Sequence, residues 1–63
     1  MNELQLAELR RQYNIKRDYY VEHDIIKPLW AMYNDKHGVI VDSVRMYDYY
    51  LRQGYKIFIG HVV

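Results

Sequence analysis

The segment LWAMYNDKHGVIVDS, residues 29–43, decides the fold of this chain. It opens with an apolar run over residues 29–33, and residues 34–38 are rich in turn formers and end in glycine. Three β-branched residues follow at 39–41, a composition that favours a strand. An apolar run, a short loop ending in glycine and a β-branched run together predict a β-hairpin. The alternative is a helix over residues 25–36 that stops at the same glycine.

A short helix with well-marked ends follows the hairpin. Ser43 is a good N-cap residue, and the helix that it starts is predicted over residues 44–53. Gly54 is expected to end this helix in the left-handed conformation, with Tyr55 packed against Tyr50, the contact that accompanies such an end. The expected inward face of the helix consists of Val44, Tyr47 and Leu51.

The C-terminal segment is predicted to supply a third strand over residues 55–62. Successive side chains of a strand point to opposite faces, so Ile57 and Ile59 lie on one side and Phe58 on the other. Both faces of the resulting sheet are therefore apolar. One face is expected to carry Trp30, Met32, Ile40 and Phe58, and the other Ala31, Tyr33, Val39, Val41, Ile57 and Ile59.

Upstream of the hairpin, residues 2–22 are predicted to form a helix capped by Asn2, and residues 23–28 a connection. Two apolar stripes run along this helix, the first formed by Leu6, Leu9, Tyr13 and Tyr20, and the second by Ile15 and Tyr19. Two stripes indicate either a helix that is contacted on two sides or a break near Asn14. We favour one helix that contacts both its own sheet and something else.

The predicted order is helix, strand, strand, helix, strand, which defines an α+β fold. The hairpin is antiparallel, and the last strand joins the same small, mainly antiparallel, three-stranded sheet after the second helix crosses over. All 63 residues fit one small domain. A domain of this size is marginally stable alone and usually depends on disulfides, a metal or a second subunit. Since the chain has no cysteine, a second subunit is expected.

The charge and hydropathy of the chain exclude several functional classes. The net charge is +1, which is typical neither of a nucleic-acid-binding polycation nor of an acidic mimic of nucleic acid. No apolar run reaches the length of a membrane span, and the N-terminus lacks the basic start and apolar stretch of a signal peptide. We therefore expect a cytoplasmic protein without a membrane partner.

Residues that usually carry catalysis or metal binding are sparse in this chain. His23, His37 and His61 lie far apart and lack the spacing of metal-ligand pairs. The chain has no cysteine and no threonine, and helix capping explains Ser43, its only serine. The three glycines are too scattered for a phosphate-binding loop. We therefore predict no catalytic residue, metal or cofactor, and a protein that is not an enzyme.

Eight tyrosines provide the main indication of function. A large ring with a hydroxyl group is common at contact surfaces, and so short a chain cannot bury all eight of them. We therefore expect a protein contact surface on the first helix and at the start of the hairpin. Its predicted residues are Leu6, Leu9, Tyr13, Tyr19, Tyr20 and Trp30.

The segment 10–17 indicates an alternative function, because it holds four of the nine positive charges. On a helix these charges would follow a phosphate backbone, and Tyr13 would stack on a base. The competing interpretation is a solvated helix face balanced by nearby acidic residues. The residues of this nucleic-acid alternative are Arg10, Arg11, Lys16 and Arg17.

Three stretches of the C-terminal half are similar to hairpin–helix units in many short proteins of bacteriophages and their hosts. The stretches are residues 30–35, residues 38–43, and Tyr50 with Gly54 and Tyr55. This resemblance implies a phage-type accessory protein that binds and blocks a host enzyme or defence factor, or serves as a minor assembly part. It carries no functional residue across. We expect a non-enzymatic, homodimeric interaction protein, with a nucleic-acid-binding regulator as the alternative.

Overall fold

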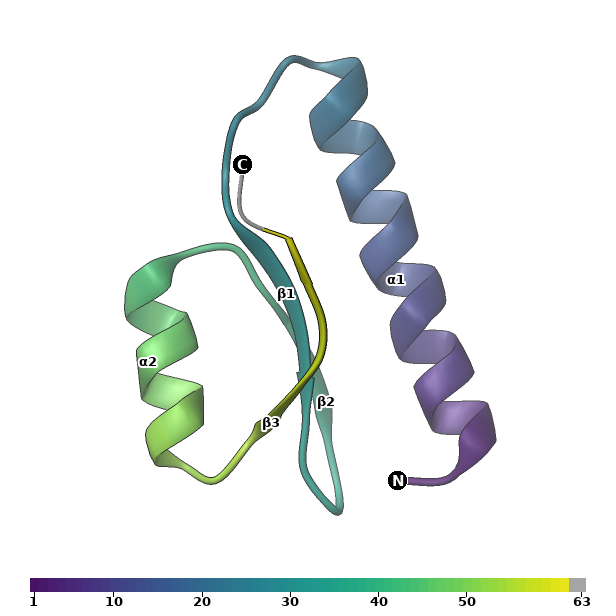
Figure 1. Cartoon of the computed structure of the whole chain (residues 1–63). Helices are drawn as coiled ribbons and strands as arrows, with labels where there is room; N and C mark the ends of the chain where they lie inside the picture. The colour runs from purple at the N-terminus through teal and green to yellow at the C-terminus, as the bar shows by residue number, and fades with distance from the viewer. Residues whose placement is uncertain (62–63) are drawn as a thin grey trace.

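The computed structural model describes residues 1–61, the last of them by its backbone (Figure 1). Two helices and three strands follow in the predicted order, so the α+β fold is confirmed. The elements are α1 (Glu3–Glu22), β1 (Leu29–Tyr33), β2 (Gly38–Val41), α2 (Val44–Arg52) and β3 (Lys56–His61). Residue 62, the predicted end of the last strand, lies outside the described residues.

The hairpin predicted from residues 29–43 is present, and the alternative of a helix over residues 25–36 is wrong. Asn34 organises the turn, because its side-chain oxygen accepts hydrogen bonds from the backbone N–H groups of Lys36 and His37 at 2.9 and 2.7 Å. The strands lie in the order β2-β1-β3, and β1 is antiparallel to both of its neighbours.

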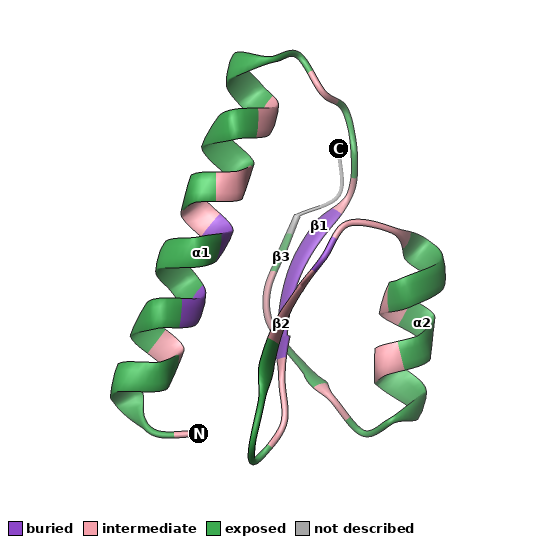
Figure 2. Cartoon of the chain, turned by 180° about the vertical axis from the view of Figure 1, so that it is seen from behind, coloured by how far each residue is buried: buried purple, intermediate pink, exposed green. Residues whose placement is uncertain are grey.

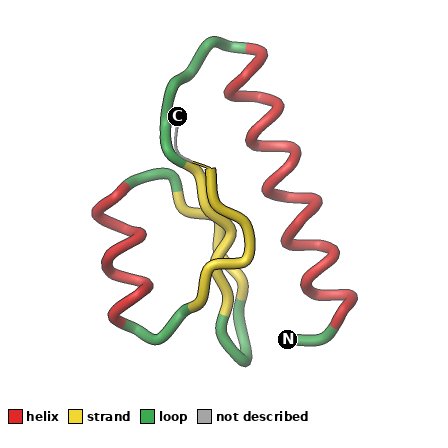
Figure 3. Tube along the Cα trace, in the orientation of Figure 1, coloured by secondary structure: helices red, strands yellow, loops and turns green. Residues whose placement is uncertain are grey.

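The helices lie on opposite faces of this sheet, which gives the molecule three layers (Figures 1 and 3). Since β2 and β3 are both antiparallel to β1, they are parallel to each other, and α2 connects them in a right-handed crossover. The Cα trace measures 33 × 26 × 11 Å, because three short strands make every layer narrow. The two broad sides of this flat molecule therefore each carry one sheet edge, β2 on one side and β3 on the other.

The α1 face of the sheet holds the first of two core clusters. Leu9 and Tyr13 of α1 pack against Leu29 and Ala31 of β1, and all four side chains are buried. Figure 2 shows the buried part of α1 on the side of the helix that faces the sheet, while the rest of the helix is largely exposed. Within residues 1–61, neither helix combines the length and the apolar character that crossing a lipid bilayer requires.

The α2 face of the sheet holds the second cluster, formed by Trp30, Met32 and Val41. The indole of Trp30 stacks on the ring of Tyr47, with 4.2 Å between the ring centroids and 20° between the planes. Tyr50 also packs against this cluster and, like Tyr47, is half-buried. Two tyrosines of α2 therefore cover the second face of the sheet.

Two details of strand pairing correct the predicted faces of the sheet. Ile40 lies directly opposite Ala31 in the hairpin, so it packs toward α1 and not on the face of Met32. A β-bulge in β3 leaves Phe58 without a partner, because Ile59 pairs with Ala31 while the next pair involves Met32. As a result Phe58 and Ile59 both pack on the α1 side, against the alternation expected of a regular strand.

The predicted helix ends are confirmed by their hydrogen bonds. Asn2 starts α1 with a reciprocal capping box, and the Ser43 hydroxyl starts α2 by accepting the backbone N–H of the third helical residue. Gly54 ends α2 with a φ of 89°. The N–H of Tyr55 then donates to the carbonyl of Tyr50 at 3.0 Å, and the two rings pack with centroids 4.8 Å apart.

Candidate interaction surface

The residues of the predicted contact surface lie at different depths in the protomer, and a partner contact by them stays a prediction. Leu9, Tyr13 and Trp30 are buried inside the protomer, where they fill the two core clusters. Leu6 and Tyr20 are half-buried. The stripe at helical spacing therefore serves to dock α1 on its own sheet, and Tyr19, which is exposed, is the one residue of the predicted set that is open to a partner.

The tyrosines divide between the core and the surface. One is buried, five are half-buried and two are exposed, so the chain does leave part of its aromatic area uncovered. The buried one is Tyr13, whose burial raises the pKa of its hydroxyl. The two exposed rings are Tyr19, stacked on His23 with centroids 4.0 Å apart, and Tyr49, which meets Tyr50 edge to face.

The helix α2 leaves far more apolar surface uncovered than α1 does for its length. Six of its nine residues are apolar or aromatic, and none of the nine is buried. At about 100° per residue these six side chains span an arc of about 220°, whereas Tyr47 and Tyr50 alone pack on the sheet. The predicted inward face was right for Tyr47 and wrong for Val44 and Leu51, which are exposed.

The exposed apolar side chains of α2 lie on two flanks. Helical spacing places Val44 and Leu51 on one flank and Met46 and Tyr49 on the other. In the right-handed crossover the first flank turns toward β3, where Ile57 lies on the same face of the sheet as Met32. The three residues Val44, Leu51 and Ile57, which we call the α2–β3 surface, are 65%, 40% and 46% exposed.

The four basic residues of the nucleic-acid alternative do not form one face of α1. At about 100° per residue, Arg10 and Arg17 share one side of the helix, while Arg11 and Lys16 lie on two other sides. Arg10 lies over the ring of Phe58, with 5.0 Å from its guanidinium carbon to the ring centroid. The other three have carboxylate partners: Glu8 for Arg11, Asp42 for Lys16 and Asp18 for Arg17.

A polar cluster joins the end of α1 to the end of β2. The Tyr20 hydroxyl donates to Asp42 Oδ2 at 2.8 Å, and Lys16 Nζ and Lys27 Nζ each lie 3.9 Å from the same oxygen. The hydrogen bond from Tyr20, assisted by the two lysines, holds the pKa of Asp42 below its usual value. Partial burial and this hydrogen bond raise the pKa of Tyr20 to about 12. The cluster therefore holds a neutral phenol on a carboxylate, which ties α1 to the sheet.

Replacing Tyr20 with phenylalanine is expected to lower the free energy of unfolding by about 1 kcal/mol, since the hydrogen bond to Asp42 is lost. Folding lowers the pKa of Asp42, so this contribution is present above pH 3.8 and is lost as the pH falls through the lower, folded value. Folding raises the pKa of Tyr20, so the contribution is lost again between pH 10.0 and about 12. Urea unfolding of both proteins from pH 2 to about 12 measures the difference. A difference that does not shrink at either end would contradict this assignment.

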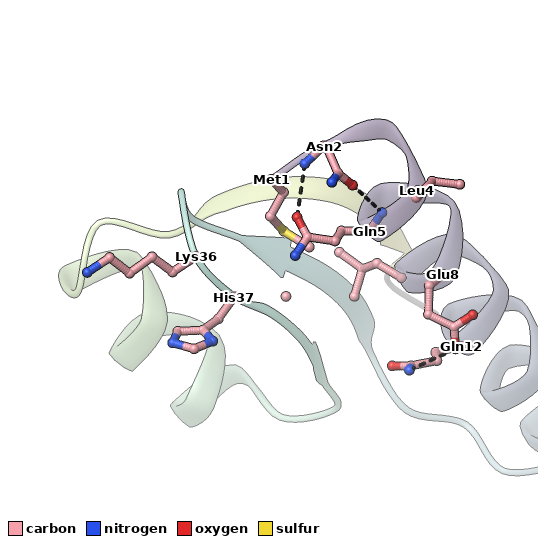
Figure 4. Close-up of a pocket in the computed structure, with 10 residues that line it drawn as sticks. Met1, Asn2, Leu4, Gln5, Glu8, Gln12, Lys36 and His37 are labelled. Atoms are coloured by element: carbon pink, nitrogen blue, oxygen red, sulfur yellow. Dashed lines mark hydrogen bonds between the residues drawn. The ribbon is translucent and has the colours of Figure 1, made fainter.

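An open groove of about 520 Å³ lies between the first half of α1 and the β1–β2 hairpin (Figure 4). Figure 4 shows Glu8 and Gln12 on the helix side and Lys36 and His37 on the hairpin side. Glu8 is held by Arg11 and Gln12, which lowers its pKa to about 2. The polar side chains that line this groove are all exposed, so none of them is desolvated in the way that a specific small-molecule site requires.

The remaining candidates for chemistry have structural partners. The Ser43 hydroxyl caps α2, and His23 Nδ1 lies 2.9 Å from the carbonyl oxygen of Tyr19. Among the side chains that the structure describes, those of residues 1–60, no three His, Cys, Asp or Glu are grouped in a way that could hold a metal ion. Comparison of the chain with models of protein families, with curated protein sequences and with solved structures found no match. Function is therefore inferred from the surfaces alone.

Sequence reasoning missed the α2–β3 surface, although one signal for it was present. The segment VRMYDYYLR has six apolar or aromatic residues in nine, which is more than one face of a two-turn helix needs. Counting the angular width of that set would have shown an apolar arc wider than a three-stranded sheet covers. The exposure of Ile57 had no such signal, because it depends on where α2 lies over β3.

Proposed function

We propose that this protein is a non-enzymatic interaction protein that binds and modulates a macromolecular partner through the α2–β3 surface. The observation that supports this proposal is that four of the six apolar and aromatic residues of α2 are between 40% and 65% exposed. Single exposed apolar residues are common on soluble proteins. A helix that leaves most of its apolar residues exposed is instead typical of a surface that a partner covers.

The partner that suits this surface is a protein with an apolar patch. Val44, Leu51 and Ile57 are aliphatic and gain free energy by leaving water, at roughly 25 cal/mol for each Å² buried. Arg45 and Lys56 lie next to them in sequence, and neither has a carboxylate partner among the described residues. Acidic side chains at the rim of the partner's patch would complement these cations. That the partner is a host enzyme or defence factor is part of the proposal, and it rests on the phage-type resemblance.

The nucleic-acid alternative has less support than the protein-binding function. Its four basic residues are spread around α1, and three of them already have carboxylate partners. A groove that follows a nucleic-acid strand needs cations aligned along one face. The protein-binding function therefore accounts better for the exposed surface.

The proposed function is tested with the double variant Val44→Gln/Leu51→Gln, which makes the α2 flank polar and leaves the core intact. Tagged wild-type protein is used to capture proteins from a lysate of the source cells, and the captured protein is then purified and titrated. We expect the double variant to bind it at least tenfold more weakly, because two amide groups placed in a desolvated apolar contact together cost more than about 1.4 kcal/mol. Circular dichroism and the fluorescence of Trp30, the single tryptophan, report that the variant is folded.

The matched control is Val21→Gln/Ile26→Gln, which also removes two exposed apolar side chains, outside the α2–β3 surface. This control is expected to bind as the wild type does. Equal binding by the α2 variant and the wild type would overturn the proposal. Failure of the wild-type protein to retain any protein specifically at micromolar concentration would overturn it as well.

A further inference from the structure

The outer edge of β2 has free backbone hydrogen-bonding groups. Asn34 N–H donates to His37 O at 2.9 Å, and in an antiparallel ladder such pairs recur every two residues. With the observed register, Val39 and Val41 therefore turn their backbone groups toward β1. The N–H and C=O groups of Gly38 and Ile40 alternate with these and point to the open side of the sheet. A further strand can pair with this edge.

The two edges of the sheet differ in how well they are protected against such pairing. The β3 edge carries a bulge at Phe58, with Arg10 over its ring and Lys56 at its start. Bulges and cations are the devices by which proteins protect an edge strand. β2 has a regular register, no charged residue and no proline over Gly38–Val41. Of the two edges, β2 is the one suited to accept a strand.

The side of α1 that borders the β2 edge is also apolar in its middle. Glu8 and Gln12 line the groove beside Gly38. Ile15 follows Glu8 by seven residues, close to two helical turns, and Tyr19 follows Gln12 by seven. Both therefore lie on the flank that borders the groove. Ile15 is 56% exposed and Tyr19 52% exposed. The opposite flank carries the cations Arg10 and Arg17. A second α1 helix would therefore pack well on the first flank and be repelled on the other.

The position of α1 over the sheet brings two such helices to packing distance. α1 lies chiefly over β1 and β2. If a two-fold axis runs between two paired β2 strands, neighbouring strands are about 4.8 Å apart, so two α1 helices lie roughly 10 Å apart. Helices that pack through ordinary side chains have axes about 8–10 Å apart. The flank with Ile15 would then meet its own copy across the axis.

Charge and area on the β2 side also suit a second copy of the chain. Antiparallel pairing brings Lys36, which precedes each β2 strand, toward Asp42 at the end of the other. The Cα trace of this broad side measures 33 × 26 Å. An interface of standard size, roughly 800 Å² for each partner, fits within this outline.

We propose that a second copy of this chain docks on the β2 edge, so that the two sheets form one continuous six-stranded sheet with α1 packed on its symmetry mate. This inference specifies the dimer expected from the sequence. It rests on the part of the proposed function that makes the protein an interaction protein, and it uses a surface separate from the α2–β3 surface. Formation of the dimer leaves Val44 and Leu51 free for a different partner.

Sedimentation equilibrium from about 1 to 500 µM tests the dimer with the variant Ile15→Lys. The wild type is expected to have twice the mass of one chain at high concentration. Ile15→Lys is expected to raise the dissociation constant at least tenfold, since the symmetry places two added charges near the axis. The control Val21→Lys adds the same charge on the flank with Arg17 and is expected to dimerise as the wild type does.

Hydrogen exchange of single amides tests which edge is used. The Ile40 amide is expected to exchange fast in dilute protein and to become protected as the dimer forms, while the Val39 amide stays protected throughout. A wild type that is monomeric at 500 µM, or a dimer that Ile15→Lys does not weaken, would overturn the inference. The inference would also be overturned if the Ile40 amide became protected from exchange only after a different protein was added. The Val44→Gln/Leu51→Gln variant is expected to dimerise normally, so a failed α2–β3 surface and a failed dimer give different results.

Discussion

Replacing Tyr13 with alanine is expected to leave the protein largely unfolded at 25 °C. The Tyr13 side chain is 2% exposed and lies between α1 and β1, in contact with the cluster of Leu9, Leu29 and Ala31. Removing a buried aromatic ring typically costs about 3–5 kcal/mol, from lost burial and from the cavity left behind. A chain of this length has a total free energy of unfolding of about 3–9 kcal/mol. Far-ultraviolet circular dichroism and urea titration measure the loss.

The matched control for this prediction is Tyr13→Phe. This substitution removes only the hydroxyl, and the buried ring that packs in the α1 core cluster stays in place. Phenylalanine keeps the ring and is expected to change the free energy of unfolding by less than about 1 kcal/mol. A folded Tyr13→Ala protein with normal stability would show that this ring lies at the surface, as the sequence prediction had it.

Replacing Trp30 with alanine is expected to destabilise the protein by about 3–5 kcal/mol. The indole is buried under α2, stacks on Tyr47, and contributes the largest side chain of the second core cluster. Gly60 lies opposite Trp30 in the sheet, and a Cβ atom there would come within 2.9 Å of the indole. The strand β3 therefore leaves space that the indole fills. Thermal unfolding followed by circular dichroism measures the effect.

A double-mutant cycle separates stacking from simple burial in this cluster. The variants Trp30→Leu, Tyr47→Leu and their combination keep apolar volume while they remove one or both rings. Stacked aromatic pairs are worth about 0.5–1.5 kcal/mol beyond their burial. The stability losses of the two single variants are therefore expected to sum to more than the loss of the double variant by that amount. Strictly additive losses would mean that α2 is held by burial alone, and that the stacking with Tyr47 contributes no free energy of its own.

The boundaries of the elements were predictable because the signals for them act over a few residues. Asn2 and Ser43 cap backbone N–H groups within three positions of themselves, and Gly54 adopts a positive φ that other residues avoid. The hairpin was equally local, since Asn34 bonds the backbone of the turn that it begins. Each of these features depends on residues within a few positions of one another, so it can be predicted from the sequence.

The exposure of individual apolar side chains was not predictable in the same way. Apolar residues at helical spacing, such as Leu9 and Tyr13, are equally consistent with a core stripe and with a binding stripe. The choice depends on which segment packs against the helix, and here β1 and β2 do. For α2, Val44 was expected to face the sheet and is exposed instead, because the narrow sheet covers Tyr47 and Tyr50 alone.

The sequence by itself therefore determined the order of helices and strands, their ends and the antiparallel hairpin. The tertiary structure alone decided which apolar side chains face water. Local structure follows from backbone hydrogen bonds and torsion angles between near neighbours, whereas burial follows from the placement of distant segments. One bulge at Phe58 put two consecutive side chains on the same face, and three short strands were too narrow to cover α2. Neither the bulge at Phe58 nor the exposure of α2 is specified by interactions between residues that are close in the sequence.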